Sequence, residues 1–148
     1  RTAEIINSFH GKMIEVHSDL MEMDQGDFEG VSFKELLARE KEFLRRWVAQ
    51  PASVSMPRGE SLADVQNRAC RTIEKIIAAG EDALVVAHNF TIAAILCRLS
   101  NISLNEFRSV CVDNASKTLI RIHDGQTSVE LINDRSHLAQ TGFQGGSK

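Results

Sequence analysis

The segment that most constrains the fold is an apolar run at residues 83–96, ALVVAHNFTIAAIL, which contains a single ionisable side chain, His88. Its first residues are β-formers without a polar face, as is typical of a strand buried on both sides of a parallel sheet. Asn89 interrupts this pattern, and the small apolar residues that follow indicate a buried helix over 90–99. We therefore expect a strand over 83–88 that leads directly into a helix.

His88 stands at the junction between these two elements, and this position predicts an anion site. Open α/β sheets bind ligands at the carboxyl ends of their strands, and the free N–H groups of a helix N-terminus favour a negative charge. A His at such a place can donate hydrogen bonds to an oxyanion or exchange protons near neutral pH. A His within an apolar run is more often a satisfied core residue, but the junction favours the phosphate-binding interpretation.

The remaining elements alternate between helix and strand along the chain. Ser61 and Asp64 have the spacing of a capping box at the start of a helix that Gly80 ends, and Asp124-Gly125 is a strong hairpin signal. We predict helices over 2–9, 33–49, 62–79 and 90–99, a helical turn at 104–107, and strands over 13–16, 83–88, 117–123 and 127–132. This order indicates a three-layer α/β/α sandwich with a mostly parallel mixed sheet, formed by residues 1–140 and followed by a flexible tail over 141–148.

Composition excludes several classes of function. The 148 residues suffice for one buried core. The net charge of −3 argues against nucleic acid as a partner. No apolar stretch is long enough to span a membrane, so we do not expect a membrane as a partner either. The three cysteines, Cys70, Cys97 and Cys111, are odd in number and lack metal-like spacing, which favours reduced thiols and a cytoplasmic location. No zinc-ligand pattern and no Gly-rich phosphate loop is present, so we expect neither a metal nor another cofactor.

Three carboxylates lie in a polar, glycine-punctuated loop over 18–30: Glu22, Asp24 and Glu29. Glu22 stands between two methionines, and apolar neighbours favour the protonated form that a general acid needs. For Asp24 and Glu29, a solvated loop is as good an interpretation as a role in a site. On the helix that follows Ser61, Arg68 is a better candidate than Arg71 for pairing with a loop carboxylate.

Five segments together resemble the histidine phosphatase superfamily, the group of phosphotransfer enzymes similar to phosphoglycerate mutase. They occur in the order TAEII (2–6), LMEMDQGDFEG (20–30), RGESLADV (58–65), VVAHN (85–89) and LINDRSHL (131–138). Each motif is weak singly, but their order and their gaps fit the family over nearly the whole chain.

The resemblance implies a phosphomonoester hydrolase, or a related mutase (isomerase), that acts on a small phosphorylated substrate through a phosphohistidine intermediate. In the family one His attacks the phosphoryl group, a second His and two arginines hold it, and a Glu protonates the leaving oxygen. His88 matches the second His and Glu22 matches the acid. The backbone N–H of Asn89 would add a contact to the phosphate.

The chain departs from the family pattern at its start. The family's nucleophile lies in an Arg-His-Gly motif on an N-terminal strand, and this chain contains no such motif and begins RTAEII. We therefore expect the strand and the nucleophilic His to lie outside this chain, which alone would be inactive. A complementing N-terminal segment or a homodimer is the expected partner. The alternative is a non-catalytic module that binds a phosphorylated ligand or a protein and has lost the nucleophile.

Overall fold

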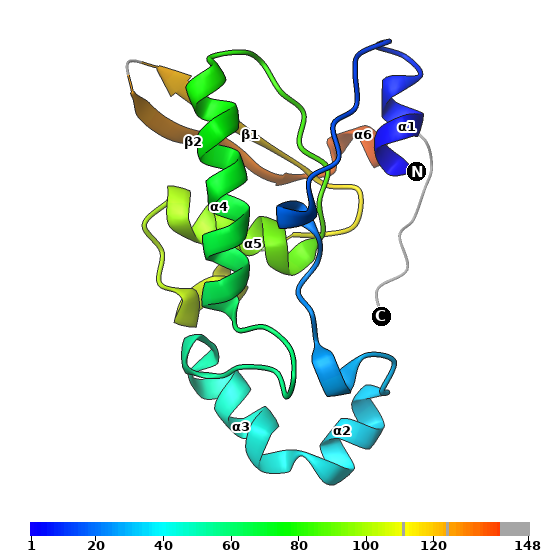
Figure 1. Cartoon of the computed structure of the whole chain (residues 1–148), viewed down its shortest axis with the longest axis vertical. Coiled ribbons are helices and arrows are strands. Elements are labelled where there is room, and N and C mark those ends of the chain that lie inside the picture. Colours follow the sequence, from blue (N-terminus) through cyan, green and yellow to red (C-terminus); the bar gives the residue numbers. More distant parts are fainter. Residues whose placement is uncertain (111, 124, 140–148) are drawn as a thin grey trace.

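The computed structural model describes residues 1–110, 112–123 and 125–139, which form the mixed α/β fold that the sequence predicts (Figure 1). Cys111, Asp124 and the tail over 141–148 lie outside the described residues. The helices are α1 (Thr2–Asn7), α2 (Phe33–Arg39), α3 (Lys41–Ala49), α4 (Leu62–Ala79), α5 (Asn89–Leu99) and α6 (Ser136–Ala139), and the strands are β1 (Lys117–His123) and β2 (Gln126–Asp134). Short 3-10 turns lie at Ser18–Leu20, Gly26–Phe28, Pro51–Ser53 and Leu104–Ser109. None of the described helices is long and apolar enough to cross a membrane.

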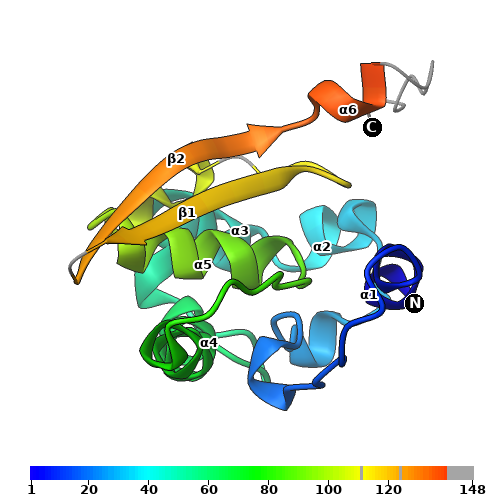
Figure 2. The ribbon, with the colours of Figure 1, turned by 90° about the horizontal axis from the view of Figure 1, so that it is seen from above.

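The sheet consists of β1 and β2, which pair antiparallel from Lys117 opposite Asp134 to His123 opposite Gln126. Gly125 has a φ of +73°, the left-handed conformation that a two-residue hairpin turn needs, so the predicted hairpin is confirmed in its strands and in this glycine. Figure 2 shows α5 between this hairpin and α4.

The predicted strands over 13–16 and 83–88 are wrong for this structure. Both segments are neither helix nor strand, and they are largely exposed: the Leu84 side chain is 70% accessible and Val16 is 92% accessible. A strand exists only when it is paired, and the two strands among the described residues pair with each other. The mostly parallel sheet is therefore not formed within the described part of the chain.

The predicted helix over 33–49 is instead two helices, α2 and α3. The chain turns at Glu40, where φ is −121° and ψ is 39°, far from helical values. Phe43 and Trp47 of α3 pack against the core, whereas Phe33 of α2 is 67% exposed. The apolar spacing thus identified the helical content correctly but not the change in direction.

The core lies where α4 crosses α5. The capping box of α4 forms as predicted, since the Ser61 hydroxyl accepts the Asp64 N–H at 3.2 Å and the Asp64 carboxylate accepts the Ser61 N–H at 2.9 Å. Small side chains on α5 allow a close approach, and the Gln66 side-chain amide on α4 donates to the Ala94 carbonyl at 2.9 Å. The buried α4 and α5 residues include Leu62, Val65, Ala69, Ile73, Ala93, Ala94, Leu96 and Cys97.

Cys70 and Cys97 are buried free thiols in this core. Burial raises the pKa of both thiols, because the charged thiolate is poorly solvated there. They are therefore packing residues rather than nucleophiles.

Two loops approach backbone to backbone beside the core. The Asp27 N–H donates to the Pro57 carbonyl at 2.9 Å, and the Glu60 N–H donates to the Asp24 carbonyl at 3.0 Å. Glycines face each other at this contact: a Cβ on Gly59 would lie only 2.8 Å from the Gly26 nitrogen and would also meet the Asp24 carbonyl oxygen. Any side chain there would force the two loops apart.

We expect Gly59→Ala to lower the free energy of unfolding by about 1–3 kcal/mol, the usual cost of overpacking a close contact. Urea unfolding followed by circular dichroism measures the change. Gly30→Ala is the control, because that glycine has a positive φ but open space around it, so it reports backbone strain alone. Because Gly59 has no positive φ, an unchanged free energy of unfolding in Gly59→Ala would contradict the steric argument.

Candidate functional site

His88 occupies the position that the sequence predicts, between an extended segment and the first turn of α5. It is the N-cap residue of α5, with φ of −114° and ψ of 175°, and its carbonyl accepts the Ile92 N–H at 2.9 Å. Its side chain forms no cap hydrogen bond and is exposed. The imidazole is therefore open to solvent at a helix N-terminus, where an anion is favoured.

Asn89, the first residue of α5, adds a backbone donor to this place. Its side-chain amide donates to the Val112 carbonyl at 3.2 Å, which fixes the residue against the segment that precedes β1. None of the hydrogen bonds formed among the described residues uses the Asn89 backbone N–H. That N–H is consequently available to an oxygen atom of a ligand.

Glu22 reaches the same helix end from the loop over 18–30. Its Oε2 accepts the Phe90 N–H at 3.2 Å, and its Oε1 accepts the Thr91 N–H at 3.2 Å. These two hydrogen bonds hold the Glu22 carboxyl group at the helix end. The structure thus brings Glu22, His88 and Asn89 together, although Glu22 lies 66 positions before His88 in the chain.

The sequence does not predict that the Glu22 carboxyl group itself accepts hydrogen bonds from two N–H groups of the first turn of α5. The neighbouring methionines also differ from the expectation of an apolar setting on both sides. Met23 is 2% exposed in the core, whereas Met21 is largely exposed. In a segment that is neither helix nor strand, no periodicity in the sequence indicates which of the two methionines is buried.

Thr91 and Arg68 hold the backbone next to Glu22 from two helices. The fully buried Thr91 hydroxyl on α5 donates to the Met21 carbonyl at 2.7 Å. The Arg68 guanidinium on α4 donates to the carbonyl oxygens of Asp19 at 2.7 Å, Met21 at 2.8 Å and Glu22 at 3.0 Å. The segment over 19–22 is thereby fixed between α4 and α5, although it contains little regular structure.

Arg68 also forms a bidentate ion pair with Glu60. Its Nε and Nη2 donate to the two carboxylate oxygens at 2.7 and 2.9 Å, and the Arg68 side chain is only 14% exposed. These hydrogen bonds hold the pKa of Glu60 below its ordinary value, and the same bonds raise the pKa of Arg68. Arg68 does pair with a carboxylate, but its partner precedes α4 and is none of the three acids in the loop over 18–30.

The other two loop acids serve the loop itself. The Asp24 carboxylate accepts the Gly26 N–H at 2.8 Å, and the Glu29 carboxylate accepts the Gln25 N–H at 3.0 Å. Both side chains are exposed. Of the acids in this loop, Glu22 reaches the α5 N-terminus, and the solvated interpretation fits Asp24 and Glu29.

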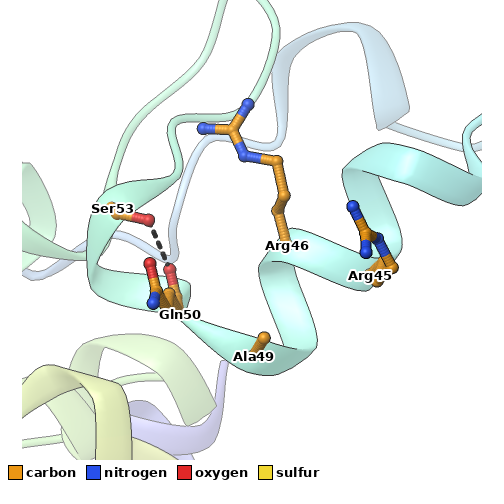
Figure 3. Close-up of a pocket in the computed structure, with 5 residues that line it drawn as sticks. All are labelled: Arg45, Arg46, Ala49, Gln50 and Ser53. Carbon is orange, nitrogen blue, oxygen red and sulfur yellow. Dashed lines mark hydrogen bonds between the residues drawn. The ribbon is translucent and has the colours of Figure 1, made fainter.

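A hollow lies beside α3, outside this constellation (Figure 3). It is lined by Arg45, Arg46, Ala49, Gln50 and Ser53. The Arg45 guanidinium is paired with Glu42 at 2.7 Å, and the Ser53 hydroxyl donates to the Gln50 carbonyl at 2.8 Å. Within the described ranges, no three His, Cys, Asp or Glu side chains cluster so as to hold a metal ion.

Comparison with known proteins gives a consistent set of similarities. The sequence profile of the histidine phosphatase superfamily (branch 1) matches residues 1–135. Phosphoserine phosphatase 1 of Hydrogenobacter thermophilus is 31% identical over 123 residues, which are 82% of this chain and 58% of that protein. Bifunctional protein Rv2228c of Mycobacterium tuberculosis is 36% identical over 126 residues, 83% of this chain and 34% of that protein.

Among solved structures, Bacillus stearothermophilus YhfR superposes with a TM-score of 0.82 at 26% sequence identity. The match covers 93% of this chain and 69% of that one. The chain spans little more than half of the Hydrogenobacter relative and about a third of the mycobacterial one.

The depressed pKa of Glu60 predicts how stability depends on pH. The ion pair contributes fully above the unfolded-state pKa of Glu60, near 4.5, and its contribution is lost as the pH falls through the lower folded-state pKa. At pH 7 we expect Glu60→Gln to cost about 1–3 kcal/mol, because Arg68 loses a charged partner. The difference from the wild type should shrink below about pH 4, where Glu60 itself becomes neutral.

Urea unfolding at pH 7, 5, 4 and 3 measures this dependence. Glu42→Gln is the control, since it removes an exposed ion pair with Arg45 and should have little effect at any of these pH values. A loss in Glu60→Gln that stays constant down to pH 3 would argue against the ion pair as its cause.

Proposed function

The chain belongs to the histidine phosphatase superfamily (branch 1), and on this premise we propose that it forms the larger part of a phosphomonoester hydrolase. The reaction proceeds through a phosphohistidine intermediate, and the nucleophilic His lies outside these 148 residues. The observation that carries the proposal is the meeting of three groups at one helix end. These are the Glu22 carboxyl, the exposed His88 imidazole and the free Asn89 N–H.

Each group has a distinct role in the proposed reaction. The His88 side chain and the Asn89 N–H bind oxygens of the phosphoryl group, where the α5 N-terminus stabilises the negative charge. The nucleophilic His attacks phosphorus, the bond to the leaving oxygen breaks, and protonated Glu22 donates its proton to that oxygen. Water then attacks the phosphohistidine, gives a proton back to Glu22, and releases inorganic phosphate and the free His.

Two extended segments support a contribution from outside the chain. Residues 13–16 and 83–87 use none of their backbone N–H or C=O groups in hydrogen bonds among the described residues. They also expose apolar side chains, including Met13, Val16 and Leu84. A complementing N-terminal strand would satisfy these backbone groups and cover these side chains, since a strand is stable when it is paired on a sheet. A homodimer that exchanges such a strand is the other arrangement that fits.

The substrate class is a small phosphomonoester. The Hydrogenobacter relative is a phosphoserine phosphatase, which makes a phosphorylated hydroxy acid the first substrate to test. A mutase (isomerase) differs only in the acceptor, because a second substrate hydroxyl then takes the phosphoryl group in place of water. The buried reduced thiols Cys70 and Cys97 are consistent with a cytoplasmic enzyme.

The alternative is a module that binds a phosphorylated ligand or a protein without catalysis. It would retain the same helix end but lack a nucleophile. The coding region upstream of Arg1 decides between the two: an Arg-His-Gly motif there supports the enzyme, and its absence supports the module.

We expect His88→Ala in the complete protein to lower kcat/KM for p-nitrophenyl phosphate by roughly 10²–10³-fold, as removal of one charge-stabilising donor commonly does. A spectrophotometric assay of p-nitrophenol release measures the change. His17→Ala is the matched control, because that His is exposed, its imidazole lies 3.3 Å from the Glu15 carboxylate, and its side chain bonds to none of Glu22, His88 and Asn89 among the described residues. Wild-type turnover in His88→Ala would refute the assigned role.

Glu22→Gln should slow the hydrolysis of alkyl phosphates by roughly 10²–10⁴-fold, but have a much smaller effect on p-nitrophenyl phosphate. An alkoxide is a poor leaving group and depends on a proton donor, whereas p-nitrophenolate leaves readily without one. Phosphate release from both substrates gives the ratio. Glu29→Gln serves as control in the same loop, and equal losses on both substrates would rule out proton donation by Glu22.

A further inference from the structure

We propose that Arg68 is the positioning residue of Glu22: it clamps the backbone at Glu22 and thereby holds the carboxyl group at the N-terminus of α5. This inference deepens the proposed function, because Glu22 is the proposed proton donor. Arg68 itself does not touch the place where the phosphoryl group would bind; it acts through the segment over 19–22.

Most of the hydrogen bonds of Arg68 hold the backbone of the segment over 19–22. A guanidinium has five N–H donors in a fixed fork, and Arg68 makes five hydrogen bonds of 2.7 to 3.0 Å. Three of them end on the carbonyl oxygens of Asp19, Met21 and Glu22, and two end on Glu60. An arginine that served only to neutralise Glu60 would not need the three carbonyls.

The segment that Arg68 holds has little regular secondary structure. After the 3-10 turn at Ser18–Leu20, residues 21–25 are in no helix or strand. The Met21 carbonyl accepts a hydrogen bond from the Thr91 hydroxyl on α5 and another from the Arg68 guanidinium on α4. With its backbone held at this point, the Glu22 side chain reaches the N–H groups of Phe90 and Thr91.

Glu60 keeps the fork of Arg68 in the required orientation. Its carboxylate binds the guanidinium on one edge and also accepts the Asp24 N–H at 2.9 Å, which ties the far side of the loop to the same centre. A lysine cannot replace this arrangement, because its ammonium has three donors and no planar fork. Holding the Glu22 segment therefore depends on the planar shape of the guanidinium and not on its charge alone.

Arg71 provides a matched control three residues further along α4. It approaches the Asp19 carboxylate at 3.6 Å, its side chain is 59% exposed, and it makes no hydrogen bond to the carbonyls of residues 19–22 within the described part of the chain. The two arginines share a helix and a neighbour but differ in the backbone clamp.

The first test follows the position of the Glu22 carboxyl without using activity. Hydrogen–deuterium exchange of the Phe90 and Thr91 amides is measured by NMR in the complete protein for wild type, Arg68→Met, Arg68→Lys and Arg71→Met. We expect both amides to exchange at least ~10-fold faster in the two Arg68 variants, because they lose their acceptor. The amides of Ile95 and Leu96, deep in α5, and all amides in Arg71→Met should keep wild-type rates.

Two results would overturn the proposal. One is wild-type exchange of Phe90 and Thr91 in Arg68→Met. The other is a uniform increase along α5 in both Arg68 variants, which would assign Arg68 to global stability. Arg68→Lys guards against a Met variant that fails to fold, since it retains the charge opposite Glu60.

The second test is a double-mutant cycle on an alkyl phosphate. Arg68→Met should lower kcat by roughly 10²-fold in the wild-type background, as misplacement of a catalytic group by about 1 Å does, and should have no further effect in Glu22→Gln. Additive losses would show that Arg68 acts independently of Glu22 and would refute the proposal. If the wild type hydrolyses no phosphomonoester, the proposed function fails, while the exchange rates still decide whether Arg68 positions Glu22.

Discussion

The ion pair between Arg68 and Glu60 holds together α4, the segment that carries Glu22 and the loop that follows it. The guanidinium joins α4 to the carbonyls of the segment that carries Glu22, and the carboxylate joins the start of α4 to the Asp24 N–H. Because the pair is partly buried and fully hydrogen-bonded, neither partner can be removed without leaving a charge that lacks compensation. The position of Glu22 at the α5 N-terminus is a consequence of this centre.

Much of the site and of the local structure follows from sequence. The caps of α4 at Ser61 and Gly80, the helix α5 after His88 and the β1–β2 hairpin are each specified by residues within a few positions of one another. Local rules therefore predict them. The methionine neighbours and the family resemblance both point to Glu22, and the structure places it at the same helix end as the residues that this resemblance selects.

The features that sequence did not predict are those that depend on distant partners. Residues 83–88 have the composition of a buried strand, but a strand forms only when another one pairs with it, and neither of the described strands pairs with this segment. The bend at Glu40 and the choice of Glu60 as partner of Arg68 likewise depend on packing across the fold. Hydrophobic periodicity reports the burial of a face and carries no information about what covers it.

The contact between Gly26 and Gly59 has a consequence for how this protein can vary. Between Asp27 and Pro57 the chain forms α2 and α3, and the two ends of this stretch meet where the Asp27 N–H donates to the Pro57 carbonyl. The α2–α3 excursion is therefore a lobe with a closed neck, since its two ends meet at one point (Figure 1). We expect changes at exposed positions of this lobe, away from Phe43 and Trp47, to leave the Arg68 centre intact as long as the neck keeps its two glycines.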